Sequence, residues 1–561
     1  MLVEDDGVAV CERTFIHFPD GLTRASMMPL AHLVQVLLVF VALLIVGCDN
    51  SEQRCAEPSP FQRGAAGMFC TAGPTDCEPG LACRGWTGDN ETSSGAVCGA
   101  CTDAVECPTL DGCGDDGVCG ACVSDGQCRD DEACRLGFCL PESVPVWNLE
   151  LDETDWQKLQ TDWYSDYYFD CSLQAGGEKF DDGCEVRPYG STSRRYPKKS
   201  LRIRFPDGAD HPGFTRKITL RAEYNDSTYM RTFIAYETFR RLTSLPTPNV
   251  RFIELQINGE TYGLMLELER NGPKFLEENG RDRDLPMFEA ERAPPWGGMM
   301  PMACSDEYEF FDAKELYNQK SGEDGDIEAL QQLIEDVLWQ DYLDSQGDIG
   351  SVLDRTRQVV DLDSHVSYLA IHGLIQNRDH VAANYHVAQQ SEQQWANHFI
   401  PDGGTQSQDA STDRMWWEVY PYDLDTSFGC VYDSVNVDNI CDDLQSDVWW
   451  LGGLFPDDEP VGYPHEQWGN LLSHLVLDNA DCRNVFNHRL RDFSQDPWWT
   501  ERLPELVVGL RETLKDPVQR DNNDLNVETD LSDWEESIYE LLQFIPARAS
   551  YIQECVDAEC G

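Results

Sequence analysis

Two short segments carry side chains suited to phosphoryl transfer. The first places Asp379 five residues ahead of Asn384, and the second places Asp423 and Asp425 just past an aromatic-rich run. Phosphoryl transfer in protein kinases needs an Asp that orients the substrate hydroxyl, together with an Asn and an Asp that hold metal. The residue types and their order therefore predict a phosphotransferase site.

The surrounding pattern predicts how these segments meet. A helical pattern ends near Gln376, and the residues that follow the first segment, 385–388, alternate as a short strand. A second strand over 415–420 leads into the Asp-Leu-Asp segment. Both loops then lie at one end of a hairpin, where their oxygens converge as a Mg²⁺ site requires. The simpler alternatives are an Asx-capped loop for the first segment and a structural Ca²⁺ site for the second.

A basic segment further upstream could face phosphates. Gly190 to Ser193 form a turn, and Lys198 and Lys199 precede a strand that alternates from Leu201 to Phe205. A lysine that enters a cleft from such a strand can pair nucleotide phosphates. The alternative is a hairpin turn beside an exposed basic edge strand.

The next segments predict a β-rich block with one helix. The helix runs over 229–242 and carries Glu237, which either pairs with the strand lysine or lies on a solvated face. Strands over 250–257 and 262–268 are joined across Asn258-Gly259, which is a strong hairpin signal.

Taken in order, these segments resemble the CotH kinase family, the spore-coat-protein-H-like secretory kinases. The resemblance rests on the Asn377–Asn384 loop, the Lys198-Lys199-Ser200 run, the Asn258-Gly259 hairpin followed by Glu269, and the Asp423-Leu424-Asp425 segment. Asn377 stands where ordinary kinases have a His, and Asp-Leu-Asp stands where they have Asp-Phe-Gly, as in the family.

The resemblance implies a role for each site residue. Asp379 orients the substrate hydroxyl, and Lys199 pairs the phosphates as the second catalytic residue. The implied metal ligands are Asn384, Asp423 and Asp425. The implied contacts to the nucleotide are Gly190, Ser191, Ser193, Lys198, Lys199, Glu237 and Glu269. The implied cofactors are ATP and Mg²⁺ or Mn²⁺.

The expected fold class is α+β. The resemblance implies an atypical, two-lobed protein-kinase-like domain, with a small lobe over 141–270 and a large lobe over 271–561. A small disulfide-rich region over 49–140 precedes it.

The charge of the chain limits its partners. The 561 residues include 42 basic and 101 acidic ones, a net charge of -59. Such a surface repels nucleic acid and anionic lipid, so no nucleic-acid partner is expected. The acidic residues are scattered, which is typical of a solubilising surface.

The N-terminal region predicts export. Leu33 to Val46 is almost entirely apolar and leads into Gly47-Cys48, which resembles a bacterial lipobox. We expect residues 1–47 to be a cleaved signal peptide and Cys48 to be lipidated, so that a lipid anchors the protein in the cell envelope of a bacterium. The alternative is an uncleaved anchor helix over 27–47.

Cysteines are concentrated ahead of the large domain. Residues 55–139 hold 13 of the 23, and the spacing of four of them recurs 21 residues later. The repeat consists of Cys98, Cys101, Cys107 and Cys113, followed by Cys119, Cys122, Cys128 and Cys134. With few large apolar residues in the region, two disulfides per unit are expected to replace a core, in a stalk or a protein-binding module.

The pairing itself stays open. The odd cysteine, with Cys55 as the candidate, pairs elsewhere or stays free. A zinc ribbon is the alternative, since Cys98-x2-Cys101 and Cys119-x2-Cys122 have a suitable separation. Local bridges are expected for three further pairs, which are Cys171–Cys184, Cys430–Cys441 and Cys555–Cys560.

Two functions are compatible with these patterns. The first is an exported, lipid-anchored kinase that uses ATP to phosphorylate Ser or Thr on secreted or cell-surface proteins. The second is an inactive kinase fold that serves as a structural or adhesion protein at the surface.

Overall fold

The computed structural model describes most of the chain from residue 110 onward, together with short pieces upstream. The described residues are 55, 82–84, 97–102, 107, 110–115, 117–162, 164–190, 192–290, 316–323, 325–340, 348–377, 380, 384–391, 414–429, 431–432, 439–440, 470–521 and 531–558. The predicted signal segment and Cys48 lie outside them. Within these ranges no helix is long and apolar enough to span a bilayer.

Seven strands close into a barrel, in the order β10-β11-β13-β12-β7-β8-β9. All neighbours are antiparallel except β7 and β12, which are parallel. The strands are β7 (Val146–Glu150), β8 (Phe169–Ala175), β9 (Glu178–Pro188), β10 (Leu201–Arg204), β11 (Lys217–Arg221), β12 (Val250–Ile257) and β13 (Glu260–Leu268). The alternation of β10 places Leu201 and Ile203 in the barrel core and turns Arg202 and Arg204 outward.

The turn between β12 and β13 forms as predicted. Asn258 and Gly259 both have positive φ, 53° and 85°, as a tight two-residue hairpin requires. Helix α2 (Glu153–Thr161) also belongs to this part of the chain, and the side chain of Asp152 caps its N-terminus.

A second sheet lies beside the barrel and has the order β15-β14-β16-β17. Its strands are β14 (Met287–Ala290), β15 (Tyr317–Ser321), β16 (Tyr385–Ser391) and β17 (Met415–Pro421), all antiparallel. Helix α9 (Leu362–Ile375) is buried along nearly its whole length and ends at Gln376, whose φ of 55° turns the chain into the loop before β16. The predicted order of helix, loop and hairpin is therefore present.

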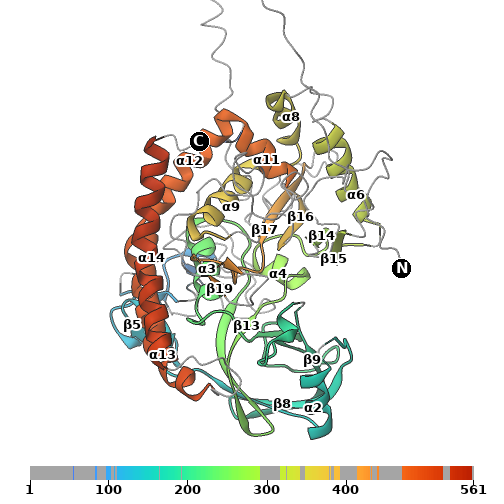
Figure 1. The fold of residues 1–561 in the computed structure, drawn as a ribbon, viewed down its shortest axis with the longest axis vertical. Coiled ribbons are helices and arrows are strands. Elements are labelled where there is room, and N and C mark those ends of the chain that lie inside the picture. Colours follow the sequence, from blue (N-terminus) through green and yellow to red (C-terminus); the bar gives the residue numbers. More distant parts are fainter. Residues whose placement is uncertain are drawn as a thin grey trace, which may run out of the picture.

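Helices surround this sheet and one side of the barrel. The two long helices α13 and α14 run along one edge of the molecule, and α13 contacts β13 of the barrel (Figure 1). Helix α6 begins at Ile327 and continues from Leu333 as the π-helical segment η6. The helices are α3 (Arg231–Leu242), α4 (Pro273–Glu278), α6 (Ile327–Gln332), η6 (Leu333–Gln340), α8 (Ile349–Thr356), α9, α11 (Leu471–Asp478), α12 (Ala480–Gln495), η8 (Trp498–Arg502), α13 (Leu503–Arg520) and α14 (Leu531–Ala558).

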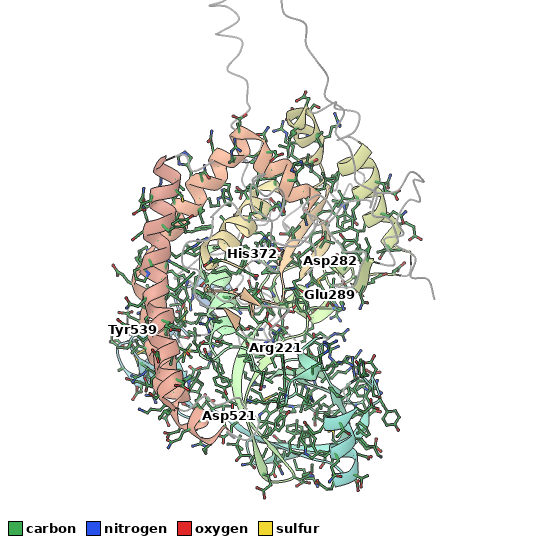
Figure 2. All side chains as sticks on the ribbon, viewed as in Figure 1. Arg221, Asp282, Glu289, His372, Asp521 and Tyr539 are labelled. Atoms are coloured by element: carbon green, nitrogen blue, oxygen red, sulfur yellow. A yellow bond between two sulfur atoms is a disulfide. The ribbon has the colours of Figure 1, made fainter. Side chains whose placement is uncertain are left out.

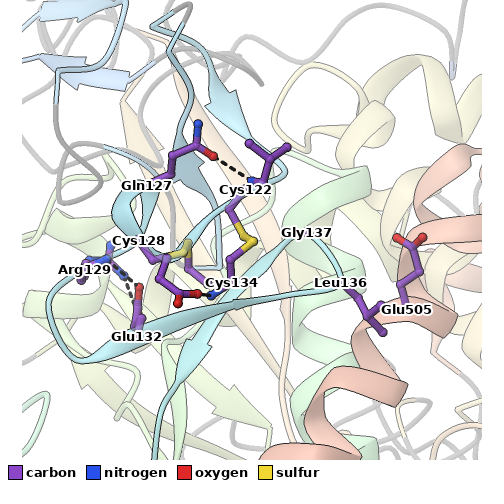
Figure 3. Close-up of a disulfide and its surroundings, with 12 residues drawn as sticks. Cys122, Gln127, Cys128, Arg129, Glu132, Cys134, Leu136, Gly137 and Glu505 are labelled. Atoms are coloured by element: carbon purple, nitrogen blue, oxygen red, sulfur yellow. Dashed lines mark hydrogen bonds and ion pairs between the residues drawn. A yellow bond between two sulfur atoms is a disulfide. The ribbon is translucent and has the colours of Figure 1, made fainter.

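The cysteine-rich region is held by disulfides, as predicted, in short hairpins, but the expectation of two disulfides within each repeat is wrong, because Cys107 and Cys128 bond to cysteines outside their own repeat. Its described strands are β1 (Ala82–Arg84) with β2 (Val97–Gly99), β3 (Gly112–Cys113) with β4 (Cys119–Gly120), and β5 (Glu132–Arg135) with β6 (Phe138–Pro141). Its disulfides are Cys101–Cys113, Cys107–Cys119, Cys122–Cys134 and Cys128–Cys139. Cys119 opens the second repeat and bonds back to Cys107, so the two repeats interlock. Figure 3 shows Cys122–Cys134 with the polar contacts that brace its turn.

These bonds decide several alternatives. Cys101, Cys119 and Cys122 are each in a disulfide, which excludes the zinc ribbon. The expected bridge between Cys171 and Cys184 is present. Cys55 pairs outside its region, with Cys482 of α12. Both other expected local pairs include residues outside the described ranges.

The end of the cysteine-rich region packs against the helices instead of standing apart as a stalk. Phe138 is buried and meets the ring of Trp498 edge-on at 6.2 Å. Arg502 stacks on Phe138 and donates to the carbonyls of Leu136 and Gly137 at 3.0 and 2.9 Å. This region therefore shares one hydrophobic core with the helices of the large domain.

Candidate active site

A cavity of about 360 Å³ opens between the barrel and the four-stranded sheet. Its walls come from β9, β10 and β11, from the end of β13, from β14 and β16, and from the loop after β17. Figure 2 labels Arg221 and Glu289, which line it from the barrel side and from the sheet side. The cavity thus lies where the two sheets face each other.

The hairpin brings both predicted loops to this cavity. In the β16–β17 register Tyr385 lies opposite Pro421, so Asn384 and the Asp-Leu-Asp segment leave the same end. Thr426 donates to the side-chain oxygen of Asn377 at 3.1 Å and ties the two loops together. Asn384, Asp423 and Asp425 all line the cavity, as the sequence led us to expect.

Asp379 lies outside the described residues. Its neighbourhood is fixed on both sides, since the ring of His380 contacts the carbonyl of Asn377 at 2.8 Å and Asn384 follows four residues later. The loop that carries Asp379 therefore ends at Asn384, which lines the cavity.

Arg221 holds the two acidic residues of the second loop. Its guanidinium donates to Asp423, to Asp425 at 2.7 Å and to Glu223 at 2.8 Å. Burial disfavours the charge of Arg221, but the nearby carboxylates outweigh burial and hold the pKa of Arg221 well above its ordinary value. Burial also raises the pKa of Glu223, against the opposing effect of Arg221.

The backbone is constrained where these side chains project. Asn384 and Asp423 have positive φ values of 60° and 54°, which non-glycine residues adopt at an energetic cost. The side-chain amide nitrogen of Asn384, Nδ2, is buried and has no hydrogen-bond partner in the part of the chain that the structure describes. Two carboxylates and one amide form a hard-oxygen donor set of the kind that Mg²⁺ and Mn²⁺ prefer. These residues therefore fit a divalent ion.

The predicted phosphate loop lies on the opposite wall. Gly190 and Ser193 line the cavity, while Ser191 lies outside the described residues. Gly190 has a φ of 101°, and a Cβ there would come within 2.0 Å of the Ser193 hydroxyl, so the turn requires glycine.

The two adjacent lysines occupy different environments. Lys198 borders the cavity, but its ammonium is fully buried and donates to Asp521 and to the carbonyl of Leu264, both at 2.6 Å. Lys199 does not line the cavity, and its ammonium donates to the carbonyl of Tyr196. Burial lowers the pKa of both lysines, and Asp521 opposes this effect at Lys198.

Strand alternation explains the position of Lys199. It shares a face with Leu201, and in a closed barrel that face points to the interior. Ser200 and Arg202 have the opposite parity and line the cavity. The cleft-facing cations from these strands are therefore Arg202 and Arg221, which the sequence argument missed. The same alternation could have identified Arg202 once the barrel was known to close.

The two predicted glutamates also differ. Glu237 is buried and pairs with Arg240 at 3.1 Å and with Arg241 at 3.8 Å, away from the cavity lining. Neither alternative for it, a pair with Lys199 or a solvated face, is therefore present. Glu269 does line the cavity and accepts from the backbone and side chain of Asn249 at 2.9 and 3.0 Å. Burial, aided by a neighbouring carboxylate, raises the pKa of Glu269 well above its ordinary value.

A direct contact joins the two walls. The hydroxyls of Tyr189, at the end of β9, and Tyr422, after β17, lie 2.7 Å apart. The ring of Tyr422 meets His386 edge-on at 4.7 Å. The barrel wall of the cavity and the acidic loop are thereby held in one arrangement.

Comparison with known proteins agrees with this geometry. The family model described as CotH kinase protein matches residues 186–552, from within β9 to the last turns of α14. Inner spore coat protein H of Bacillus subtilis (strain 168) is 21% identical over 413 residues, which cover 73% of this chain and 97% of that protein. The family match extends over more than half of the chain and includes every predicted nucleotide and metal residue. The chain therefore belongs to the CotH kinase family.

Proposed function

We propose that this protein is a phosphotransferase that uses ATP and Mg²⁺ or Mn²⁺ to phosphorylate Ser or Thr of secreted or cell-surface proteins. In this proposal the barrel acts as the small lobe and the four-stranded sheet with its helices as the large lobe of an atypical protein kinase. The observation that carries the proposal is the convergence of Asn384, Asp423 and Asp425 on a cavity whose other wall is cationic.

Each group has a role that follows from its position. Asn384, Asp423 and Asp425 would hold the divalent ion, which supplies charge neutralisation at the phosphate oxygens when bound. Arg221 faces the same space and would bind phosphate oxygens. Asp379, on the loop between Asn377 and Asn384, would accept the hydrogen bond of the substrate hydroxyl and later its proton.

Arg221 would change partners during binding. Its guanidinium pairs with the carboxylates that are the proposed metal ligands. A ligand with phosphate groups offers Arg221 other anionic oxygens and frees these carboxylates for the ion. The loss of one set of charge-assisted bonds is then offset by the other.

The test is transfer of γ-phosphate to protein by the purified full chain. We expect incorporation that requires Mg²⁺ or Mn²⁺, and a loss of more than about 100-fold in Asp423→Asn, because a positioned charge at the reacting phosphate is removed. Asp284→Asn is the matched control, since the Asp284 side chain is 90% exposed and lies outside the cavity lining. Equal incorporation by the Asp423 variant would refute the site.

The alternative function is an inactive surface protein with this fold. The pairing of Arg221 with both acidic residues favours it, because the arginine already neutralises charge on those carboxylates. Thermal unfolding with increasing Mg²⁺-ATP separates the two proposals, since a ligand that binds only the folded state raises the unfolding temperature. No shift at any concentration would favour the inactive protein.

The proposed location is the bacterial cell envelope, with the chain anchored through a lipid on Cys48. The disulfides agree with an oxidising compartment. Mass spectrometry of the mature N-terminus tests this location. We expect a lipid-modified Cys48 as the first residue, and an unprocessed chain in Cys48→Ser.

A further inference from the structure

The outer face of β9, β10 and β11 carries basic side chains opposite one another. Arg187 of β9 lies in register with Arg202 of β10, and Arg204 of β10 lies in register with Lys217 of β11. Like charges directly opposite on neighbouring strands destabilise a sheet. The barrel therefore keeps positive charge on this face at the expense of its own stability.

Only part of this charge is neutralised within the protein. Arg187 pairs with Asp166, and Arg204 with Glu185, each at 2.5 Å. In the described ranges of the chain, no carboxylate lies within ion-pair distance of Arg202, Lys217 or Arg270. We name these three residues the cationic face.

The members of the cationic face repel one another. After burial, the largest cause that lowers the pKa of Lys217 is Arg270, followed by Arg216 and Arg202. Burial and then Arg202 lower the pKa of Arg270. Arg202 and Arg270 line the same cavity, and Lys217 lies two residues along β11 from Thr219, which is opposite Arg202, so a single anionic segment can contact all three.

The cationic face extends beyond the nucleotide-sized cavity. Arg202 and Arg270 line the cavity, but Lys217 does not. Lys217 is in register with Arg204, two residues further along β10 than Arg202, which is a step of about 7 Å. A ligand that contacts both Arg202 and Lys217 must therefore extend beyond the cavity.

The charge of the whole chain makes this face an exception. With a net charge of -59, the protein as a whole repels anions. A cationic face beside the proposed reaction site would attract an anion locally and orient it.

We propose that the cationic face binds an acidic stretch of the polypeptide substrate, adjacent to the hydroxyl that receives phosphate. The proposal rests on the proposed phosphotransferase function and adds to it the class of substrate. Arg202 and Arg270 contact the acidic residues nearest the hydroxyl, and Lys217 contacts those further away.

The test is fluorescence anisotropy with three labelled serine peptides of equal length, in the absence of nucleotide. One peptide has Asp and Glu around the serine, one has Asn and Gln, and one has Lys. The full chain is expected to bind the acidic peptide about tenfold more tightly than the neutral one, with a preference that weakens as salt rises.

Lys217→Glu is the informative variant because it leaves the cavity lining intact. It should weaken acidic-peptide binding about tenfold while neutral-peptide binding stays unchanged. The variant should also fold, since Glu at this position faces Arg204 and replaces a like-charge pair with an opposite-charge pair. Lys515→Glu makes the same charge change on α13, where the lysine is half exposed, and is expected to bind like the wild type.

Three outcomes would overturn the proposal. The first is equal binding of acidic and neutral peptides, and the second is an unchanged affinity for the acidic peptide in Lys217→Glu. The third is complete displacement of the acidic peptide by saturating Mg²⁺-ATP, which would assign the cationic face to the nucleotide. Selective peptide binding without any phosphate transfer would count against the proposed function alone, so the two failures are distinguishable.

Discussion

The barrel carries two cation–carboxylate assemblies that differ in their access to solvent. Lys198 and Asp521 are 0% and 1% exposed in their side chains and join the barrel to the end of α13. Arg221 joins the barrel to Asp423 and Asp425, whose side chains are 25% and 36% exposed and line the cavity. The Lys198–Asp521 pair (the closed pair) is sealed from solvent, whereas the Arg221 assembly (the open assembly) can release its carboxylates to a ligand.

The closed pair depends on a glycine as well as on charge. Gly263 has a φ of 126°, and a Cβ there would come within 1.9 Å of an Asp521 oxygen. The approach of α13 to the barrel therefore requires a residue without a side chain. We interpret the closed pair as structural and the open assembly as functional.

Breaking the closed pair should have the largest effect on stability. Asp521→Asn leaves the Lys198 charge buried without a counter-ion, and we expect a loss of about 3–5 kcal/mol in the free energy of unfolding, measured with urea. Removing both charges, in Lys198→Met with Asp521→Asn, should recover most of this loss. Asp207→Asn, at a side chain 86% exposed, is the control. A loss below about 1 kcal/mol in Asp521→Asn would show that the pair is not structural.

A third group of titratable side chains extends the comparison. It is buried, and its side chains are expected to carry no charge. His365, His372 and His380 are buried beside Tyr368. Burial lowers the pKa of His365 to about 3 and that of His380 to about 4, and lowers the pKa of His372 well below its ordinary value.

This assembly predicts acid sensitivity. The unfolded chain takes up protons below about pH 6.5, while the folded chain keeps these rings neutral. The contribution of these histidines to the free energy of unfolding is fully present above that pH. It is lost as the pH falls toward the pKa values of the folded chain, by about 1.4 kcal/mol per pH unit and per histidine. Urea unfolding at pH 7.5 and pH 5 should show this slope, and His365→Gln should reduce it by one histidine's share. The control is His488→Gln, at an exposed histidine. If His365→Gln leaves the pH dependence of the unfolding free energy unchanged, His365 does not contribute to the acid sensitivity.

Changing the open assembly should alter metal binding more than stability. Arg221→Gln removes a positive charge next to the proposed metal ligands, so we expect Mn²⁺ to bind about tenfold more tightly in the absence of nucleotide. The spectroscopic signal of free Mn²⁺ measures this affinity. Arg221→Lys keeps the charge and should stay close to the wild type. Weaker Mn²⁺ binding in Arg221→Gln would contradict competition between Arg221 and the ion.

The smallest effect is expected where the cysteine-rich region meets α3. Asp111 pairs with Arg241 at 2.7 Å, and both side chains are partly exposed. Asp111→Asn should lower the unfolding free energy by about 1 kcal/mol and leave phosphate transfer unchanged. A large loss of transfer would instead show that this region controls the site through α3.

Local patterns were sufficient to predict the parts of the fold that depend on neighbouring residues. The Asn258-Gly259 turn, the helix that ends at Gln376 and the hairpin that gathers Asn384 and Asp423 all follow from such signals. The disulfide between Cys171 and Cys184 was also predictable from its acidic, glycine-containing loop.

What could not be predicted depends on contacts between distant residues. The assignment of Lys199 to the cavity failed because alternation does not say which face is enclosed until the barrel closes. Lys198 meets Asp521, and Cys55 meets Cys482, across more than 300 residues of sequence. No local spacing specifies such pairs, and the role of Arg221 emerges only with its three carboxylate partners in place.

The central claim is that Asp423, Asp425 and Asn384 form the metal-dependent nucleotide site. Isothermal titration calorimetry of ATP with Mg²⁺ into the full chain tests it most directly, using wild type and Asp423→Asn. The claim predicts one saturable site in the wild type that requires the ion and is weakened more than about tenfold in Asp423→Asn. Binding of equal affinity in both proteins, or no ion-dependent binding in the wild type, would contradict it.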